Sequence, residues 1–140
     1  MPKLWQCPKC KRQFSHKNQG HSCVIYPVKK HLAHGTDLSR SLYFELLKKL
    51  KKIGPIRIES LSCCIHFVSK QAYTFGCCYI MKNKIRLHSV LKNEIKDKRV
   101  NKWSKMSGQR YLYEIDIADK NELDALLTKW LKEAYYYRMM

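Results

Sequence analysis

Apolar side chains recur at helical spacing before residue 54 and again near the end of the chain, and between these regions they alternate with polar ones. The first helix is expected to begin at a cap formed by Thr36 or Asp37 and to end at Gly54-Pro55. Its apolar stripe consists of Leu38, Leu42, Leu46, Leu50 and Ile53.

The middle of the chain predicts strands, because it is rich in β-branched and aromatic residues with only short polar breaks. These strands are expected at Ile56–Leu61, Cys63–Val68, Tyr73–Met81 and Lys84–Leu91. Two-residue turns at Lys70-Gln71 and Lys82-Asn83 would make the last three strands an antiparallel meander. The side chains expected on the core face are Cys63, Ile65, Phe67, Cys78, Ile80, Ile85 and Leu87, and those on the opposite face are His66, Tyr73, Phe75, Tyr79, Lys84, Arg86 and His88. A register slip of one residue would exchange the two faces.

The last third of the chain adds one strand and one helix. Residues 92–108 are basic and polar and are interpreted as a loop, whereas Tyr111, Tyr113, Ile115 and Ile117 alternate as a strand would. Asp119 and Glu122 resemble a capping box ahead of a closing helix, whose stripe is Leu123, Leu126, Leu127, Trp130, Leu131 and Ala134. The pattern therefore predicts an α+β fold: an antiparallel sheet of about five strands with two helices on one face.

A shorter unit precedes this domain. Residues 1–35 hold too few large apolar side chains to form a core, so we divide the chain into a small zinc knuckle with a linker (1–35) and an α+β domain (36–140). Hydrophobic residues make up 45% of the 140 residues, which excludes a disordered chain. No apolar run approaches the roughly 18 residues that a membrane span requires, and the N-terminus lacks a signal-peptide core. We expect a cytoplasmic monomer that has no membrane partner.

Three of the seven cysteines lie close together near the N-terminus. Cys7-Pro8-Lys9-Cys10 is a CxxC motif, and His21-Ser22-Cys23 follows ten residues later. CxxC presents two thiolates from one turn, and a Cys₃His set suits tetrahedral Zn²⁺. The metal ligands are therefore predicted to be Cys7, Cys10, His21 and Cys23, with His16 as the competitor for the nitrogen position. Because protein would fill every coordination position, the site is interpreted as structural.

These residues also carry a resemblance. Trp5–Cys10, Phe14, Asn18-Gln19 and His21–Cys23 resemble the N-terminus of small bacterial proteins in the Domain of Unknown Function 5655 family. The resemblance continues through Gly54-Pro55, Lys84–His88, Glu122–Asp124 and Trp130–Tyr135. It implies a zinc knuckle followed by a compact α+β domain, and it favours His21 over His16. One departure is Lys11, where the family pattern often has glycine. The resemblance implies an architecture and no particular activity.

A formal net charge of +17 favours a polyanionic partner. We interpret the protein as a non-catalytic nucleic-acid-binding module that contacts phosphates more than bases. The predicted contacts are Lys9, Lys11, Arg12 and Lys17 in the knuckle, Lys84 and Arg86 on the sheet, and Lys98, Arg99, Lys102 and Lys105 in the basic loop. Tyr73, Phe75 and Tyr79 are candidates for stacking on unpaired bases, or for a second apolar layer.

Two other function classes remain open. One is a protein-interaction module whose knuckle docks a partner. The other is a nuclease-like hydrolase that uses acidic residues of the last strand and helix, Glu114, Asp116, Asp119 and Glu122. Glu114 and Asp116, however, alternate with apolar positions as a solvated face would, and Asp119 and Glu122 are explained by capping.

A second metal site at Cys63-Cys64 and Cys77-Cys78 is not expected. Neighbours along a strand point to opposite faces, so the four thiols cannot converge on one ion. We interpret these cysteines as small buried strand residues.

Overall fold

The computed structural model describes residues 3–21, 23, 26–106, 108 and 110–137. Its helices are α1 (Val28–Ala33), α2 (Asp37–Ile53) and α3 (Ala125–Tyr136), with a 3-10 turn η1 (Lys120–Glu122) before α3. Two short strands, β1 (Trp5–Gln6) and β2 (Gln13–Phe14), form the N-terminal hairpin. The main strands are β3 (Arg57–Ser60), β4 (Ile65–Val68), β5 (Thr74–Ile80), β6 (Ile85–Leu91), β7 (Val100–Met106) and β8 (Arg110–Ile117).

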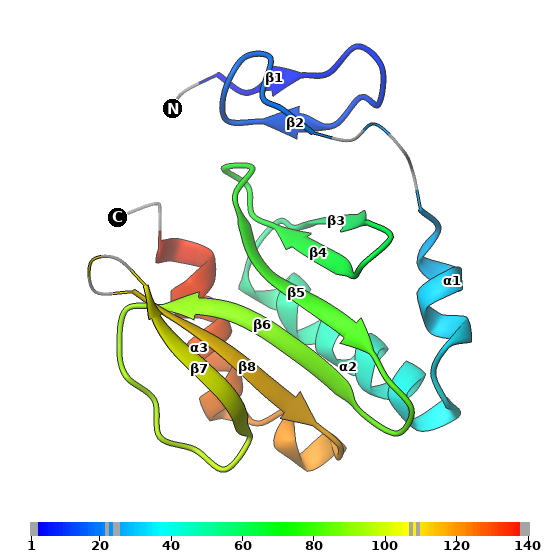
Figure 1. Cartoon of the computed structure of the whole chain (residues 1–140), viewed down its shortest axis with the longest axis vertical. Helices are drawn as coiled ribbons and strands as arrows, with labels where there is room; N and C mark the ends of the chain where they lie inside the picture. The colour runs from blue at the N-terminus through cyan, green and yellow to red at the C-terminus, as the bar shows by residue number, and fades with distance from the viewer. Residues whose placement is uncertain (1–2, 22, 24–25, 107, 109, 138–140) are drawn as a thin grey trace.

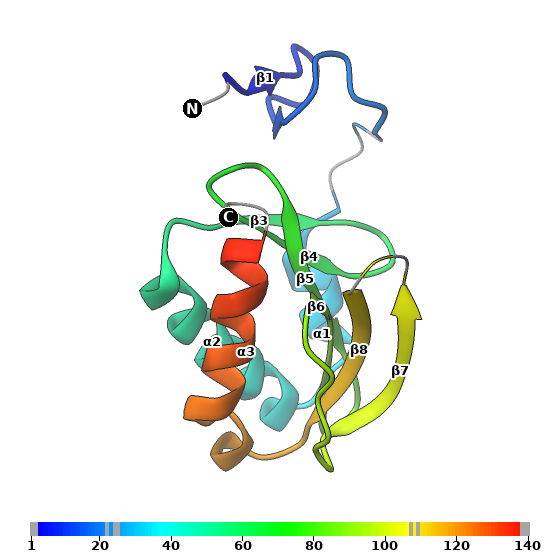
Figure 2. The same ribbon diagram turned by 90° about the vertical axis from the view of Figure 1, so that its left-hand side faces the viewer.

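The main domain is one antiparallel sheet with two long helices on one face, which confirms the predicted α+β class (Figure 1). The strand order is β3-β4-β5-β6-β8-β7. Helices α2 and α3 lie side by side against the sheet (Figure 2), and we call the other face of the sheet the open face. No helix in the described part of the chain is long and apolar enough to cross a membrane.

The core lies between the sheet and the two helices. On α2 the side chains of Leu42, Leu46 and Leu50 are fully buried, as the helical spacing predicted, whereas Leu38 of the predicted stripe is 40% exposed. Thr36 and Ser39 cap the helix reciprocally and fix where it starts. The predicted core-face strand residues that are buried are Ile65, Phe67, Cys78, Ile85 and Leu87. Cys63 is exposed, and Ile80 is only partly buried.

Phe75 was predicted on the open face, and this prediction is wrong. A β-bulge causes the difference: Phe67 pairs with Gly76 and Val68 with Thr74, so Phe75 is the extra residue between them. Its ring is buried and packs edge-on against Tyr135 of α3. A bulge leaves no mark in the alternation of residue types, so the sequence pattern could not reveal it.

Strand β7 occupies part of the segment that was predicted as a basic loop. It pairs antiparallel with β8 and forms one edge of the sheet, giving six main strands rather than about five. Residues 101–106 are exposed, so this strand buries no apolar face that would produce alternation. Its register is set instead by backbone hydrogen bonds to β8.

One helix boundary and one additional helix also differ from the pattern. Asp119 caps the short η1 turn, and the α3 N-cap is Asp124, whose side chain accepts a hydrogen bond from the Leu127 backbone N–H. Helix α1 was not predicted. Its Val28 and Leu32 pack against the core, so this helix is packed with the α+β domain although it precedes residue 36.

Candidate metal centre

The N-terminal hairpin places the CxxC motif in a tight turn between β1 and β2. The Lys11 backbone N–H donates to the Cys7 carbonyl, and the Cys7 N–H donates to the Arg12 carbonyl, both at 2.9 Å. Lys11 has a φ of 64°, in the left-handed region that glycine adopts most readily. This explains why glycine suits the position, and the chain forms the same kind of turn with lysine.

The four predicted ligands converge. The thiols of Cys7, Cys10 and Cys23 and the His21 ring nitrogen lie within 4.8 Å of one another, a geometry able to hold a metal ion. Cys7 Sγ is 3.8 Å from Cys23 Sγ, and His21 Nε2 is 3.4 Å from Cys10 Sγ and 3.3 Å from Cys23 Sγ. The competitor His16 is exposed and lies outside this cluster. Ser22, between His21 and Cys23, lies outside the described part of the chain.

A hydrogen bond and ring stacking hold the His21 imidazole in place. Its Nδ1 lies 2.7 Å from the Gln19 carbonyl oxygen, which can only accept a hydrogen bond, so Nδ1 carries the proton. In the neutral ring Nε2 then presents its lone pair to the thiols, as in other metal sites where a carbonyl orients the histidine. Phe14 stacks on the His21 ring with a centroid separation of 4.2 Å, and Trp5 packs against both rings.

The surroundings favour the charged form of two of the thiols. Hydrogen bonds from the backbone N–H groups, chiefly that of Cys10, lower the pKa of Cys7. Burial opposes ionisation of Cys10, but hydrogen bonds from the Arg12 side chain and backbone outweigh it and lower the pKa of Cys10 to about 6. Thiolates are the form that binds metal.

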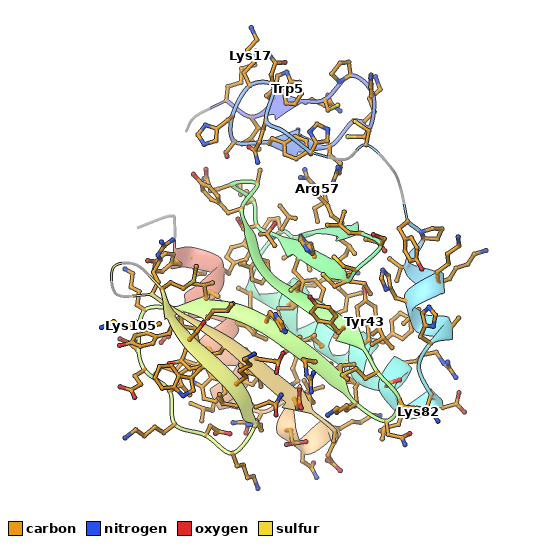
Figure 3. All side chains as sticks on the ribbon, in the orientation of Figure 1. Trp5, Lys17, Tyr43, Arg57, Lys82 and Lys105 are labelled. Atoms are coloured by element: carbon orange, nitrogen blue, oxygen red, sulfur yellow. The ribbon has the colours of Figure 1, made fainter. Side chains whose placement is uncertain are left out.

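Two arginines connect the hairpin to the main domain. Arg12 Nε donates to Cys10 Sγ at 3.4 Å, while Arg12 Nη1 lies 2.8 Å from Glu59 Oε1 on β3. Arg57, which points from β3 towards the hairpin in Figure 3, donates from Nη2 to the Gln13 carbonyl at 2.7 Å. Arg12 was predicted as a phosphate contact, and the structure places it between the thiol of a candidate metal ligand, Cys10, and a carboxylate.

The predicted sheet cations are also paired. Arg86 Nε lies 2.7 Å from Asp116 Oδ1, and Lys84 Nζ lies 3.1 Å from Asp116 Oδ2. The hydrogen bond from Arg86 is the main reason that the pKa of Asp116 is lowered. Glu114 is occupied as well, by His88 at 3.1 Å and by Arg86 at 3.8 Å. These carboxylates are therefore neutralised by basic neighbours, and among the described residues they belong to no metal-binding group.

The basic residues of the segment that was predicted as a loop (92–108) are of two kinds, one buried and the others exposed. Arg99 is buried and is held by Asp97, Asp124 and the Glu122 carbonyl, with its guanidinium 5.0 Å from the Trp130 ring centre. Its surroundings leave no room for a phosphate. Lys98 and Lys102 are exposed, as are Lys9 and Lys11 in the hairpin.

The proposed stacking residues are less accessible than the sequence indicated. Phe75 is in the core, and Tyr79 is half-buried with its ring 4.9 Å from that of His88. The sequence analysis missed Trp103 on β7, which is 52% exposed. A tryptophan among the lysines of a basic segment could have indicated this exposed aromatic residue from the sequence.

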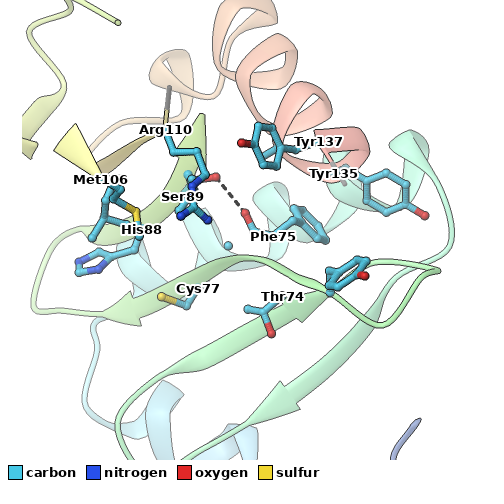
Figure 4. A pocket seen from close by; sticks show the side chains of 14 residues that line it. Thr74, Phe75, Cys77, His88, Ser89, Met106, Arg110, Tyr135 and Tyr137 are labelled. Carbon is cyan, nitrogen blue, oxygen red and sulfur yellow. Dashed lines mark hydrogen bonds between the residues drawn. The ribbon is translucent and has the colours of Figure 1, made fainter. Parts of the chain in front are cut away.

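A pocket of about 270 Å³ opens where β5, β6 and the end of α3 meet (Figure 4). Its lining includes Cys77, His88, Ser89 and Tyr135. The Ser89 hydroxyl donates to the Phe75 carbonyl at 2.9 Å, and His88 is bonded to Glu114. The serine and the histidine are thus both engaged with other groups.

Comparisons with known proteins identify the main domain. The model of the family described as Domain of unknown function (DUF5655) matches residues 28–137, while neither the curated proteins nor the solved structures include a match. The matched range begins at α1 and excludes the Cys₃His hairpin, so the ligand assignment depends on spacing and geometry alone. The chain belongs to the DUF5655 family.

Proposed function

We propose that the protein is a non-catalytic nucleic-acid-binding module whose N-terminal hairpin is stabilised by a structural Zn²⁺. Tetrahedral zinc with bonds of about 2.3 Å to sulfur and about 2.0 Å to nitrogen has S–S edges of about 3.8 Å and S–N edges of about 3.5 Å. The Cys7–Cys23 separation of 3.8 Å and the His21 separations of 3.4 and 3.3 Å are close to these edges. Cys7, Cys10, His21 and Cys23 would hold the ion, and the metal would replace the core that the hairpin lacks.

The observation that carries the nucleic-acid proposal is how the charges are distributed. The ion pairs of the described residues engage Arg12, Arg40, Arg57, Arg86 and Arg99, together with Lys48 and Lys84. Most of the acidic residues are used in these pairs, so among the described residues the positive excess consists mainly of exposed lysines. Lysine binds phosphate as a point charge without the bidentate geometry of arginine, which supports contacts to phosphate rather than reading of bases.

Strand β7 and the residues just before it form the surface best suited to this role. Lys98, Lys102 and Lys105 are exposed there and form no ion pair with a described acidic residue. Lys105 lies on the same face of β7 as the exposed indole of Trp103, whereas Lys102 precedes it on the other face of this edge strand. Lysines beside an exposed aromatic ring are typical of surfaces that follow a single strand and stack its bases. We call Lys98, Lys102, Trp103 and Lys105 the β7 surface.

Binding should weaken with salt, because each neutralised phosphate releases condensed counterions. Engagement of about five phosphates gives a log–log slope near −4.5 on duplex and near −3.5 on single strands. Replacing Lys98, Lys102 and Lys105 with alanine is expected to weaken binding to all sequences alike and to flatten the duplex slope by up to about 3 units. Trp103→Ala should cost about 1–3 kcal/mol on single strands and little on duplex. Titration of labelled single- and double-stranded DNA and RNA at several salt concentrations measures both effects.

The matched control removes the same charge from another part of the surface. Lys48, Lys51 and Lys52 are exposed near the end of α2, and their triple alanine variant should keep most of the slope. If both triple variants flatten the slope equally, binding is not localised to the β7 surface. If the unmodified chain binds none of the four nucleic acids at low salt, the proposal is wrong.

The edge position of β7 favours one alternative. An exposed edge strand offers backbone groups to which an extended peptide can add as a further strand. A protein partner whose binding is indifferent to nuclease and to Trp103→Ala would support that function instead.

A further inference from the structure

A second group of thiols lies in the main domain at the turn between β3 and β4. The Leu61 backbone N–H donates to the Cys64 carbonyl at 2.9 Å, and this hydrogen bond closes the turn. Cys63 and Cys64 therefore precede β4, and the alternation that separates neighbours on a strand does not apply to them. Their Sγ atoms are 3.4 Å apart.

Two further soft donors come from the open face of the sheet. The His66 ring, on β4, has a nitrogen within 4.8 Å of both thiols. Cys77, on β5, is the cross-strand partner of His66. Cys63, Cys64 and His66 thus form a converging group of donors, and Cys77 lies on the adjacent strand beside it.

Neighbouring residues hold this turn in position. His31 of α1 is buried, and its Nε2 lies 2.6 Å from the Leu61 carbonyl oxygen. The turn is therefore attached to helix α1, and its own backbone hydrogen bond closes it between β3 and β4.

Burial as small apolar residues does not explain the whole group. Cys78 fits that explanation, because it is fully buried on the core face and its side chain points away from Cys77. Cys63 is exposed, while His66 and Cys77 are partly exposed. The expectation that all four of these cysteines cannot share one ion holds for Cys78, but it does not separate Cys63, Cys64 and Cys77.

We propose that Cys63, Cys64, His66 and Cys77 form a second metal site that binds a thiophilic d¹⁰ ion, Cu(I) or Zn²⁺. Thiolates with one imidazole select such soft or borderline ions over hard cations. The ligand atoms of Cys63, Cys64 and His66 lie within 4.8 Å of one another, and three donors suit a low-coordinate ion. Cys77, across from His66 on β5, is the candidate for a fourth. Because Cys63 is exposed, the ion would exchange with solvent more readily than one in the Cys₃His hairpin.

The test uses the full chain with its hairpin zinc in place, reduced and without oxygen. Addition of Cu(I) in the presence of a competing Cu(I) chelator, or of Zn²⁺ with a zinc indicator, is expected to load one further equivalent per chain. For Cu(I), ultraviolet absorption from thiolate-to-metal charge transfer should rise until one equivalent per chain has been added and then stay constant. The double variant Cys63→Ser, Cys64→Ser should lose this equivalent and retain the hairpin zinc.

Two further variants separate this site from its alternatives. Cys10→Ser removes a hairpin ligand and should still load the second equivalent, and Cys78→Ala should load it as well. Cys63→Ser alone changes an exposed side chain, so its loss of binding would not reflect unfolding. If neither ion adds an equivalent to the unmodified chain, or if the added equivalent persists in the double variant, the proposal is wrong.

Discussion

Replacing Arg99 with alanine is expected to lower the free energy of unfolding by about 3 kcal/mol, because a buried ion pair that loses one partner leaves uncompensated polar groups. Arg99 Nε lies 2.9 Å from Asp97 Oδ1, and Arg99 Nη1 lies 2.9 Å from Asp124 Oδ1 and 2.7 Å from the Glu122 carbonyl. The arginine thereby connects the segment before β7 to the N-cap of α3. Urea unfolding at neutral pH, followed by circular dichroism, measures the change.

The effect should also depend on pH in a definite direction. The hydrogen bond from Arg99 lowers the pKa of Asp97 in the folded protein, so this pair stabilises the fold above the unfolded pKa of about 3.9 and loses its contribution as the pH falls through the folded pKa. The difference between Arg99→Ala and the unmodified chain should therefore be largest at neutral pH and shrink in acid.

The matched control for this prediction is the neighbouring residue. Lys98→Ala removes the same charge from an exposed side chain and should change stability by no more than about 0.5 kcal/mol. Equal effects of the two substitutions would show that the Arg99 contacts do not stabilise the fold. Arg99→Lys should remain destabilised, because an ammonium group cannot reproduce the planar fork that reaches three acceptors.

Cys10→Ser is expected to abolish tight zinc binding, since it removes one of four converging ligands. Structural zinc in small modules contributes about 10–16 kcal/mol of apparent binding free energy, and folding of such modules depends on it. Amide exchange in residues 3–21 should therefore rise in Cys10→Ser, while residues 37–136 should change little because they form their own core. Elemental analysis and hydrogen exchange on protein purified without chelator measure the two effects.

His16→Ala is the control for the ligand assignment. His16 is exposed and outside the cluster, so this variant should retain its zinc. Loss of zinc in His16→Ala with retention in His21→Ala would contradict the assignment. Global unfolding of Cys10→Ser would show that the hairpin and the main domain share one cooperative core.

The fold was predictable where the sequence shows periodicity. Helix α2 and strands β4 and β6 bury one stripe or one face, and their residue types repeat accordingly. Strand β7 and helix α1 were not predicted, for different reasons. The strand is exposed over most of its length, and the helix has only six residues. Neither element has enough buried positions to generate a pattern.

The candidate sites were likewise predictable only in part. The CxxC and HxC spacing predicted four residues that do converge, because the ligands lie within one short segment. The role of Arg99 depends on Asp124, which is distant in sequence, and nothing local to Arg99 distinguishes it from Lys98. Likewise, the Cys63-Cys64 pair was assigned to a strand, and a boundary error of two residues concealed the turn that brings the two thiols together.

The position of Arg12 between Cys10 and Glu59 has a thermodynamic consequence. Its guanidinium contacts a thiol of the candidate metal centre on one side and a β3 carboxylate on the other, so the charge at that centre and the docking of the hairpin share one residue. Linkage requires that two equilibria coupled in this way affect each other by the same factor. If a bound metal strengthens the contact between Arg12 and β3, that contact must strengthen metal binding by the same factor. The main domain would then contribute to the metal affinity of a site that lies outside it.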